Sequence, residues 1–200
     1  METRQIRELS QSFEIGAHTI DHLALTTLSP DEAESQIVDS KHWIEDVTGK
    51  RCQMFCPPLG KFNADHHRMI REAGFVGYRT VEMLSTDRPR DSHGLKVLPT
   101  TLQAHPHDRW PLVKNALKRR SIGSLMRSLG HRGGPSWPDN VGPLMNRTVK
   151  SGGVFHVWGH SWEIEENGQW QNLDECFRRI RDRQQSENWL AGANEEVCQR

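Results

Sequence analysis

The segment that decides the fold reads FEIGAHTIDHLALTTLSPDEAESQIVDSKHWIEDVTGKRCQMFCPPLG, residues 13–60. It begins with a short, partly apolar run, 13–18, that predicts a buried strand ending at His18. Residues 29–49 predict a helix, because a capping serine, a first-turn proline and a final glycine enclose apolar residues at helical spacing. Residues 53–56 predict a second strand, which two prolines end. The segment therefore predicts a strand, a helix and a parallel strand.

The rest of the chain continues this alternation. We expect a helix over 63–74, strands over 75–78 and 96–103, a basic helical region over about 110–129, a Gly/Pro-rich connection over 133–142, a buried strand over 154–158 and a helix over 173–183. Strands alternating with helices predict a parallel sheet or barrel with the helices outside. The predicted class is α/β, in a single domain spanning residues 1–200.

Composition excludes several classes of function. Lys plus Arg and Asp plus Glu are equal at 26 each, so no net charge attracts the chain to nucleic acid or an anionic membrane. No run approaches the roughly 18 apolar residues of a membrane span, and the first residues are too polar for a signal peptide. We therefore expect no nucleic-acid partner, no membrane span and, for the sequence as given, a cytoplasmic location. The four cysteines are expected to be reduced packing residues.

Two histidines follow the first predicted strand. His18 and His22 are four residues apart, and a helical turn after the strand would bring both rings to one ion at about 2.0–2.1 Å, as zinc requires. His-x-x-x-His is a loose pattern, and a pair of polar loop histidines has the same spacing. The position favours the metal site, since the carboxyl ends of barrel strands carry the active site.

A second cluster of chemically useful residues lies on the last predicted strand. Alternation places His156, Trp158 and His160 on one face, with His160 at the carboxyl end beside a glycine. His160 would then point into the mouth of a barrel, although a buried structural histidine is an equal alternative. His156 is expected to be structural, and Glu163 is expected to orient an imidazole through its carboxylate.

Three motifs occur in a characteristic order: His18-Thr-x-x-His22, the strand and turn at 55–60, and a late strand that ends at His160. In order and spacing they resemble the polysaccharide deacetylases, the carbohydrate esterases with a NodB-type homology domain. The resemblance is most specific over residues 6–80, weakens over 85–150 and returns over 152–198.

This resemblance implies a distorted (β/α) barrel that holds a divalent ion, zinc by ligand type, through one Asp and two histidines. It implies that His18 and His22 are the metal ligands and that His160 protonates the leaving amine. The ion would activate water for attack on the acetamide carbonyl of an N-acetylated sugar. The implied substrate and oxyanion region comprises Pro58, Leu59, Gly60, Trp158 and Glu163.

The chain also departs from the family pattern. The Thr-Phe-Asp-Asp-Gly stretch that supplies the third ligand and the general base is absent from these 200 residues, so we expect a chain truncated at its N-terminus, without the first strand. Cys56 stands where the family commonly has Arg, and Leu59 where an aromatic is usual. Cys56 is expected to be a buried small residue rather than a thiolate. His105 and His107 fall near the family's Asp and Trp motif and are expected to be loop residues.

The sequence thus predicts a metal-dependent hydrolase that removes N-acetyl groups from a sugar or polysaccharide. One alternative is a catalytically impaired barrel that binds carbohydrate, and another is a metal-binding protein without a sugar site. A barrel without its first strand exposes sheet edges, so we also expect self-association.

Overall fold

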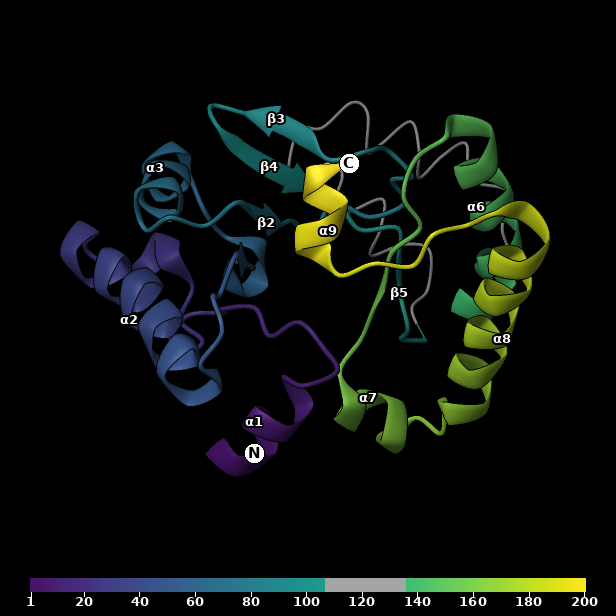
Figure 1. Ribbon diagram of the computed structural model, residues 1–200, viewed down its shortest axis with the longest axis horizontal. Helices are drawn as coiled ribbons and strands as arrows, with labels where there is room; N and C mark the ends of the chain where they lie inside the picture. Colours follow the sequence, from purple (N-terminus) through teal and green to yellow (C-terminus); the bar gives the residue numbers. More distant parts are fainter. Residues whose placement is uncertain (107–135) are drawn as a thin grey trace. The chain divides into compact units, whose positions relative to one another are not determined.

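The computed structural model of the protein describes residues 1–106 and 136–200, and it divides the chain into two compact units (Figure 1). Unit 1 comprises residues 1–81, 89–98 and 192–200; unit 2 comprises residues 82–88 and 99–191. In the described part of the chain, no helix is long and apolar enough to cross a bilayer. The predicted helix over 110–129 and His107 lie outside the described residues.

Unit 1 contains a four-stranded sheet in the order β1-β2-β4-β3. Its strands are β1 (Met54–Phe55), β2 (Gly77–Arg79), β3 (Arg90–Ser92) and β4 (Leu95–Leu98). The β1–β2 and β2–β4 pairs are parallel, and β3 returns antiparallel to β4 as a charged edge strand. The predicted strand over 13–18 is reduced to an extended segment with a single parallel bridge, from Ala17 to Phe55.

Helices cover both faces of this sheet (Figure 1). Successive side chains of a strand point to opposite faces, so each face presents apolar residues for a helix to cover. On one face, Phe55, Tyr78 and Val97 pack with α2 (Pro30–Thr48) and α3 (Ala64–Glu72). On the other face, Met54 and Leu98 pack against the short helix α9 (Asn194–Gln199). Unit 1 also contains α1 (Thr3–Leu9) and two single-turn 3₁₀ helices, η1 (Leu25–Thr27) and η2 (Pro58–Gly60).

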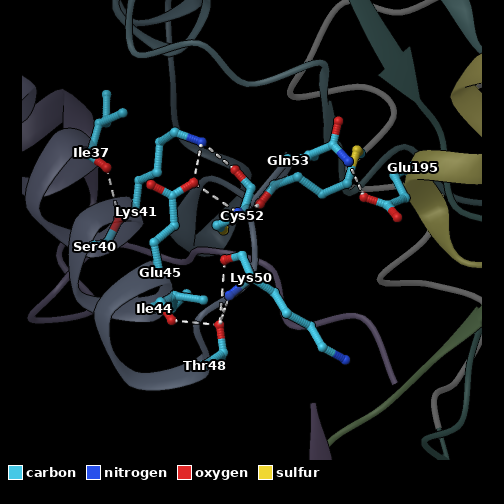
Figure 2. Close-up of polar contacts among 11 residues, drawn as sticks. Ile37, Ser40, Lys41, Ile44, Glu45, Thr48, Lys50, Cys52, Gln53 and Glu195 are labelled. Atoms are coloured by element: carbon cyan, nitrogen blue, oxygen red, sulfur yellow. Dashed lines mark hydrogen bonds and ion pairs between the residues drawn. The ribbon is translucent and has the colours of Figure 1, made fainter. Parts of the chain in front are cut away.

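Helix α2 begins and ends as its sequence predicts. Ser29 and Glu32 form a reciprocal capping box at the start, and Gly49 takes a left-handed conformation at the end. Lys41 then ties the helix to β1, as Figure 2 shows: its ammonium group contacts the Cys52 carbonyl and lies 3.1 Å from Glu45 Oε1. The Cys52 N–H donates to the same Glu45 oxygen at 2.9 Å. These contacts fix where β1 starts and therefore where the Pro-Pro turn falls.

Unit 2 is built on a parallel pair of two-residue strands, β5 (Leu102–Gln103) and β6 (Val157–Trp158). In the described part of this unit, three helices accompany them: α6 (Trp137–Ser151), α7 (Ser161–Glu166) and α8 (Trp170–Glu187). Their apolar faces form a core that includes Leu144, Met145 and Ile164. The α/β class is confirmed. The described strands lie in two sheets, so the closed barrel and the single domain stay predictions.

Several predicted elements need correction in unit 2. The described end of the Gly/Pro-rich connection, from Trp137, is the first part of helix α6 and not a loop. The strand predicted as fully buried over 154–158 is only half-buried and pairs at Val157 and Trp158 alone. The helix predicted over 173–183 begins earlier and ends later, as α8.

Candidate functional site

His18 and His22 lie side by side, but not through the helical turn that the sequence suggested. The two ring centroids are 4.8 Å apart and the ring planes meet edge to face at 64°. The intervening backbone is a bend in which Thr19 and His22 take left-handed φ values of 62° and 55°. Such a conformation is uncommon outside glycine and is an outlier for a β-branched residue, so the bend is held by contacts from elsewhere.

The side chain of Gln36, on helix α2, supplies those contacts. Its Oε1 accepts hydrogen bonds from the N–H groups of Ile20 and Asp21, both at 3.0 Å. Its Nε2 donates to Asp21 Oδ2 at 2.6 Å. One amide thus satisfies two backbone donors and turns the Asp21 carboxylate towards α2. Nothing in the local pattern of the motif signals this residue, which lies 14 or more positions away.

The ring of His18 is oriented by the turn after β1. Its Nδ1 lies 2.5 Å from the carbonyl oxygen of Cys56. Because a carbonyl can only accept, Nδ1 carries the hydrogen and Nε2 keeps its lone pair, the arrangement that second-shell carbonyls give to metal-binding histidines. Pro57 and Pro58 have no N–H, so the N–H of Leu59 is the next backbone donor in the chain. Leu59 itself has a left-handed φ of 56° and an exposed side chain.

These features fit two ligand positions of a divalent ion. The imidazoles are adjacent, and the contact of Nδ1 of His18 with the carbonyl of Cys56 makes Nε2 the candidate ligating atom of that ring. The hydroxyl of Thr19, between them, is buried without a hydrogen-bond partner among the described residues. Over residues 1–106 and 136–200, no three His, Cys, Asp or Glu side chains converge as ligands. The described residues therefore bring together two candidate ligands, His18 and His22, without a third.

A half-buried guanidinium, that of Arg79, lies beside Cys56. The β1–β2 register pairs Phe55 with Tyr78, which places Arg79 of β2 beside Cys56. Burial lowers the pKa of Arg79 to about 10, and Arg79 donates to Asn194 Oδ1 from Nε at 2.8 Å and Nη2 at 2.6 Å. The Cys56 thiol has its pKa raised to about 11 by burial. Cys56 is therefore a protonated packing group at neutral pH, and Arg79 remains a cation.

The second cluster forms around His160, the residue that precedes α7. Its Nδ1 lies 2.7 Å from Glu163 Oε2, and the two side chains are 34% and 25% exposed. His105, which follows β5, places Nε2 3.7 Å from the other oxygen of Glu163. The parallel β5–β6 pairing explains this meeting, because it brings residues past the carboxyl ends of both strands together. His105 was expected to be a plain loop residue, and only this pairing reveals its contact.

The His160 ring also lies between two tryptophans. Trp158 meets it edge to face with centroids 5.3 Å apart, and Trp162 stacks on it at 4.1 Å and 21°. His156 is half-buried, and its backbone bonds to the segment that leads into β5: its N–H donates to Thr101 Oγ1 and its carbonyl accepts from the N–H groups of Thr101 and Leu102. The structure thus forms two clusters, one in each unit, from the residues that the sequence singled out.

Comparison with known proteins places this geometry in context. Residues 1–78 match the family described as polysaccharide deacetylase. The peptidoglycan-N-acetylglucosamine deacetylase of Bacillus cereus is 35% identical over 83 residues, which are 42% of this chain and 37% of that protein. Among solved structures, a probable polysaccharide deacetylase of Pseudomonas aeruginosa PAO1 has a TM-score of 0.69 at 14% identity, over 98% of this chain and 62% of that one. PuuE allantoinase has a TM-score of 0.66 at 13% identity, over 99% of this chain and 62% of that one.

The resemblance to polysaccharide deacetylases is therefore confirmed over residues 1–78. The likeness to the solved structures establishes the fold alone, and an allantoinase shares it, so the fold does not select the substrate. The chain spans 33% and 37% of the length of two curated relatives that it matches. The activity and substrate of the whole protein are consequently matters for proposal.

Proposed function

We propose that this chain carries part of the active site of a metal-dependent N-deacetylase acting on an N-acetylated sugar or polysaccharide. The observation that carries the proposal is the adjacent His18–His22 pair within the segment that matches the family, with the ring of His18 oriented by the Cys56 carbonyl. The relative from Bacillus cereus, a peptidoglycan-N-acetylglucosamine deacetylase, supports the substrate class. The distorted barrel belongs to the same proposal.

In this proposal His18 and His22 would hold the divalent ion, with zinc favoured by two imidazole ligands. When bound, such an ion supplies Lewis acidity towards an acyl oxygen. Gln36 keeps the two rings adjacent, and the Cys56 carbonyl orients the ring of His18 through Nδ1. The N–H of Leu59 would donate to the oxygen that gains negative charge as the acetamide carbonyl is attacked.

His160 would act as the acid. Glu163 accepts a hydrogen bond from Nδ1, so Nε2 is the nitrogen that gains and gives the second proton. Water adds to the acetamide carbonyl and supplies the second oxygen of acetate; as the carbonyl–nitrogen bond breaks, the proton on Nε2 of His160 passes to the leaving amine of the sugar, and a proton of the water restores His160. Acetate and a free amine are the products. The stacked indole of Trp162 and the carboxylate of Glu163 restrict rotation of the ring. The other members of the predicted substrate region, Pro58, Gly60 and Trp158, keep that role as part of the proposal.

Acetate release tests this function. Zinc-loaded protein is incubated with an oligomer of N-acetylglucosamine, and acetate and free amine are quantified together. We expect equal amounts of both products, with loss of both in His160→Ala. Sugar binding and zinc binding without any acetate would overturn the proposal.

A second function is favoured by one observation. The 200 residues contain no Asp-Asp pair, and no third ligand joins the two histidines among the described residues. Both facts suit a module that binds carbohydrate or metal without turnover. Bound zinc and sugar-dependent protection of the chain from protease, with no acetate released, would support this second function.

A further inference from the structure

Trp162 is an exposed aromatic residue beside the proposed acid. Its side chain is 59% exposed, although its ring stacks on the His160 imidazole at 4.1 Å and 21°. A stacked imidazole covers only one face of an indole. The exposure and the stacking together leave the other face of the indole open to solvent, on a residue that is in contact with His160.

An indole face that stays exposed contributes nothing to folding through burial. Aromatic side chains contribute to stability by being buried, at roughly 25 cal/mol per Å² of apolar surface, and an exposed face gives up that gain. The first turn of α7 holds this ring in place, since Ser161 begins the helix and Trp162 follows it. The neighbouring Ile164, by contrast, is buried in the core of unit 2.

We propose that Trp162 is the platform on which a pyranose ring of the substrate stacks. This inference rests on the proposed function, because it takes His160 as the group that approaches the acetamide nitrogen. A proton donor must come within about 2.6–3.2 Å of that nitrogen, and the nitrogen is bonded directly to the sugar ring. Because the imidazole covers one face of the Trp162 indole, the open face lies on the side away from His160. It would therefore receive a neighbouring pyranose ring of an oligomeric substrate, not the ring whose acetamide nitrogen meets His160.

The chemistry of the two surfaces is complementary. A pyranose of the gluco type presents axial C–H bonds on each face and carries its hydroxyl groups around the rim. Those C–H bonds suit the electron-rich face of an indole, while the rim stays hydrated. Trp162 is therefore a substrate-positioning residue that selects a saturated sugar ring over an acyclic amide.

The test is isothermal titration with tri-N-acetylchitotriose, together with the kinetics of acetate release. We expect Trp162→Ala to raise the Kd and KM about tenfold, which corresponds to about 1.4 kcal/mol. Trp162→Phe keeps an aromatic face and should recover most of the affinity. The matched control is Trp170→Ala on α8. The side chain of Trp170 is also exposed, at 48%, and its removal should leave the Kd and the KM unchanged.

Two outcomes would overturn the platform: unchanged affinity in Trp162→Ala with a native circular dichroism spectrum, or no sugar binding by the unaltered protein. An equal loss of sugar affinity in Trp162→Phe and Trp162→Ala would also contradict the platform, since both substitutions would then act by disturbing the packing. The deacetylase proposal fails separately. Sugar binding that depends on Trp162, with no acetate released, would support the platform and refute the enzyme.

Discussion

Replacing Gln36 by alanine should weaken zinc binding without unfolding the protein. The side chain makes the three hydrogen bonds that hold the bend between His18 and His22. The bend contains two left-handed residues, each costing on the order of 1–3 kcal/mol. Without Gln36, those costs favour relaxation of the bend, and the rings move apart.

The magnitude follows from the hydrogen bonds. A hydrogen bond contributes a net free energy of about 0.5–1.5 kcal/mol, and the lower limit applies here because the bend is exposed. Three such bonds amount to about 1.5 kcal/mol. If this energy sets the fraction of molecules with the rings adjacent, the apparent Kd for zinc rises about tenfold.

The assay is competition for zinc against a chromophoric chelator. Glu34→Ala is the matched control, since it is an exposed position two residues away on the same helix. Unchanged zinc affinity in Gln36→Ala, or an equal loss in Glu34→Ala, would refute the reasoning. Thermal unfolding of each variant confirms that the comparison is made between folded proteins.

Three further predictions concern the two histidines on either side of β6, the carboxyl group of Glu14 and self-association of the chain. His160→Ala should abolish acetate release and cost less than about 1 kcal/mol of stability, whereas His156→Ala should cost about 1–3 kcal/mol; loss of activity in His156→Ala at an unchanged Tm would reverse these assignments. Burial, reinforced by a neighbouring carboxylate, raises the pKa of Glu14, so its stabilising contribution is present at low pH and is lost as the pH rises through the folded-state pKa. Glu14→Gln should therefore have a higher Tm than the unaltered protein at pH 7, and the two Tm values should converge near pH 3.5. A difference in Tm that does not change with pH would contradict a raised pKa for Glu14. Self-association should occur along the side of the sheet formed by residues 13–17, and sedimentation of a single monomer at all concentrations would exclude it.

Local signals predicted the elements whose ends are fixed by neighbouring residues. Helix α2 was expected over 29–49 and is found as Pro30–Thr48, because its capping box and its final glycine act within a few residues. Helix α6 was missed for a complementary reason. Its prolines read as loop residues, but Pro138 lies in the first turn, where no hydrogen bond is lost, and burial of Val141 and Leu144 favours the helix.

In the candidate site, too, local patterns predicted some features and tertiary contacts determined the others. The spacing of His18 and His22 predicted that the rings would be adjacent, but the bend that achieves this depends on Gln36, a contact that spacing does not contain. His105 likewise reaches Glu163 only because β5 pairs with β6. Sequence patterns thus identified residues of both clusters, and tertiary pairing determined which neighbours support them.

The most direct test of the account is isothermal titration of zinc into the unaltered protein and into the double variant His18→Ala/His22→Ala. Two imidazoles with no third ligand from the described chain should bind one zinc ion weakly, and the double variant should bind none. Equal zinc uptake by the two proteins would contradict the central claim that these histidines hold the ion.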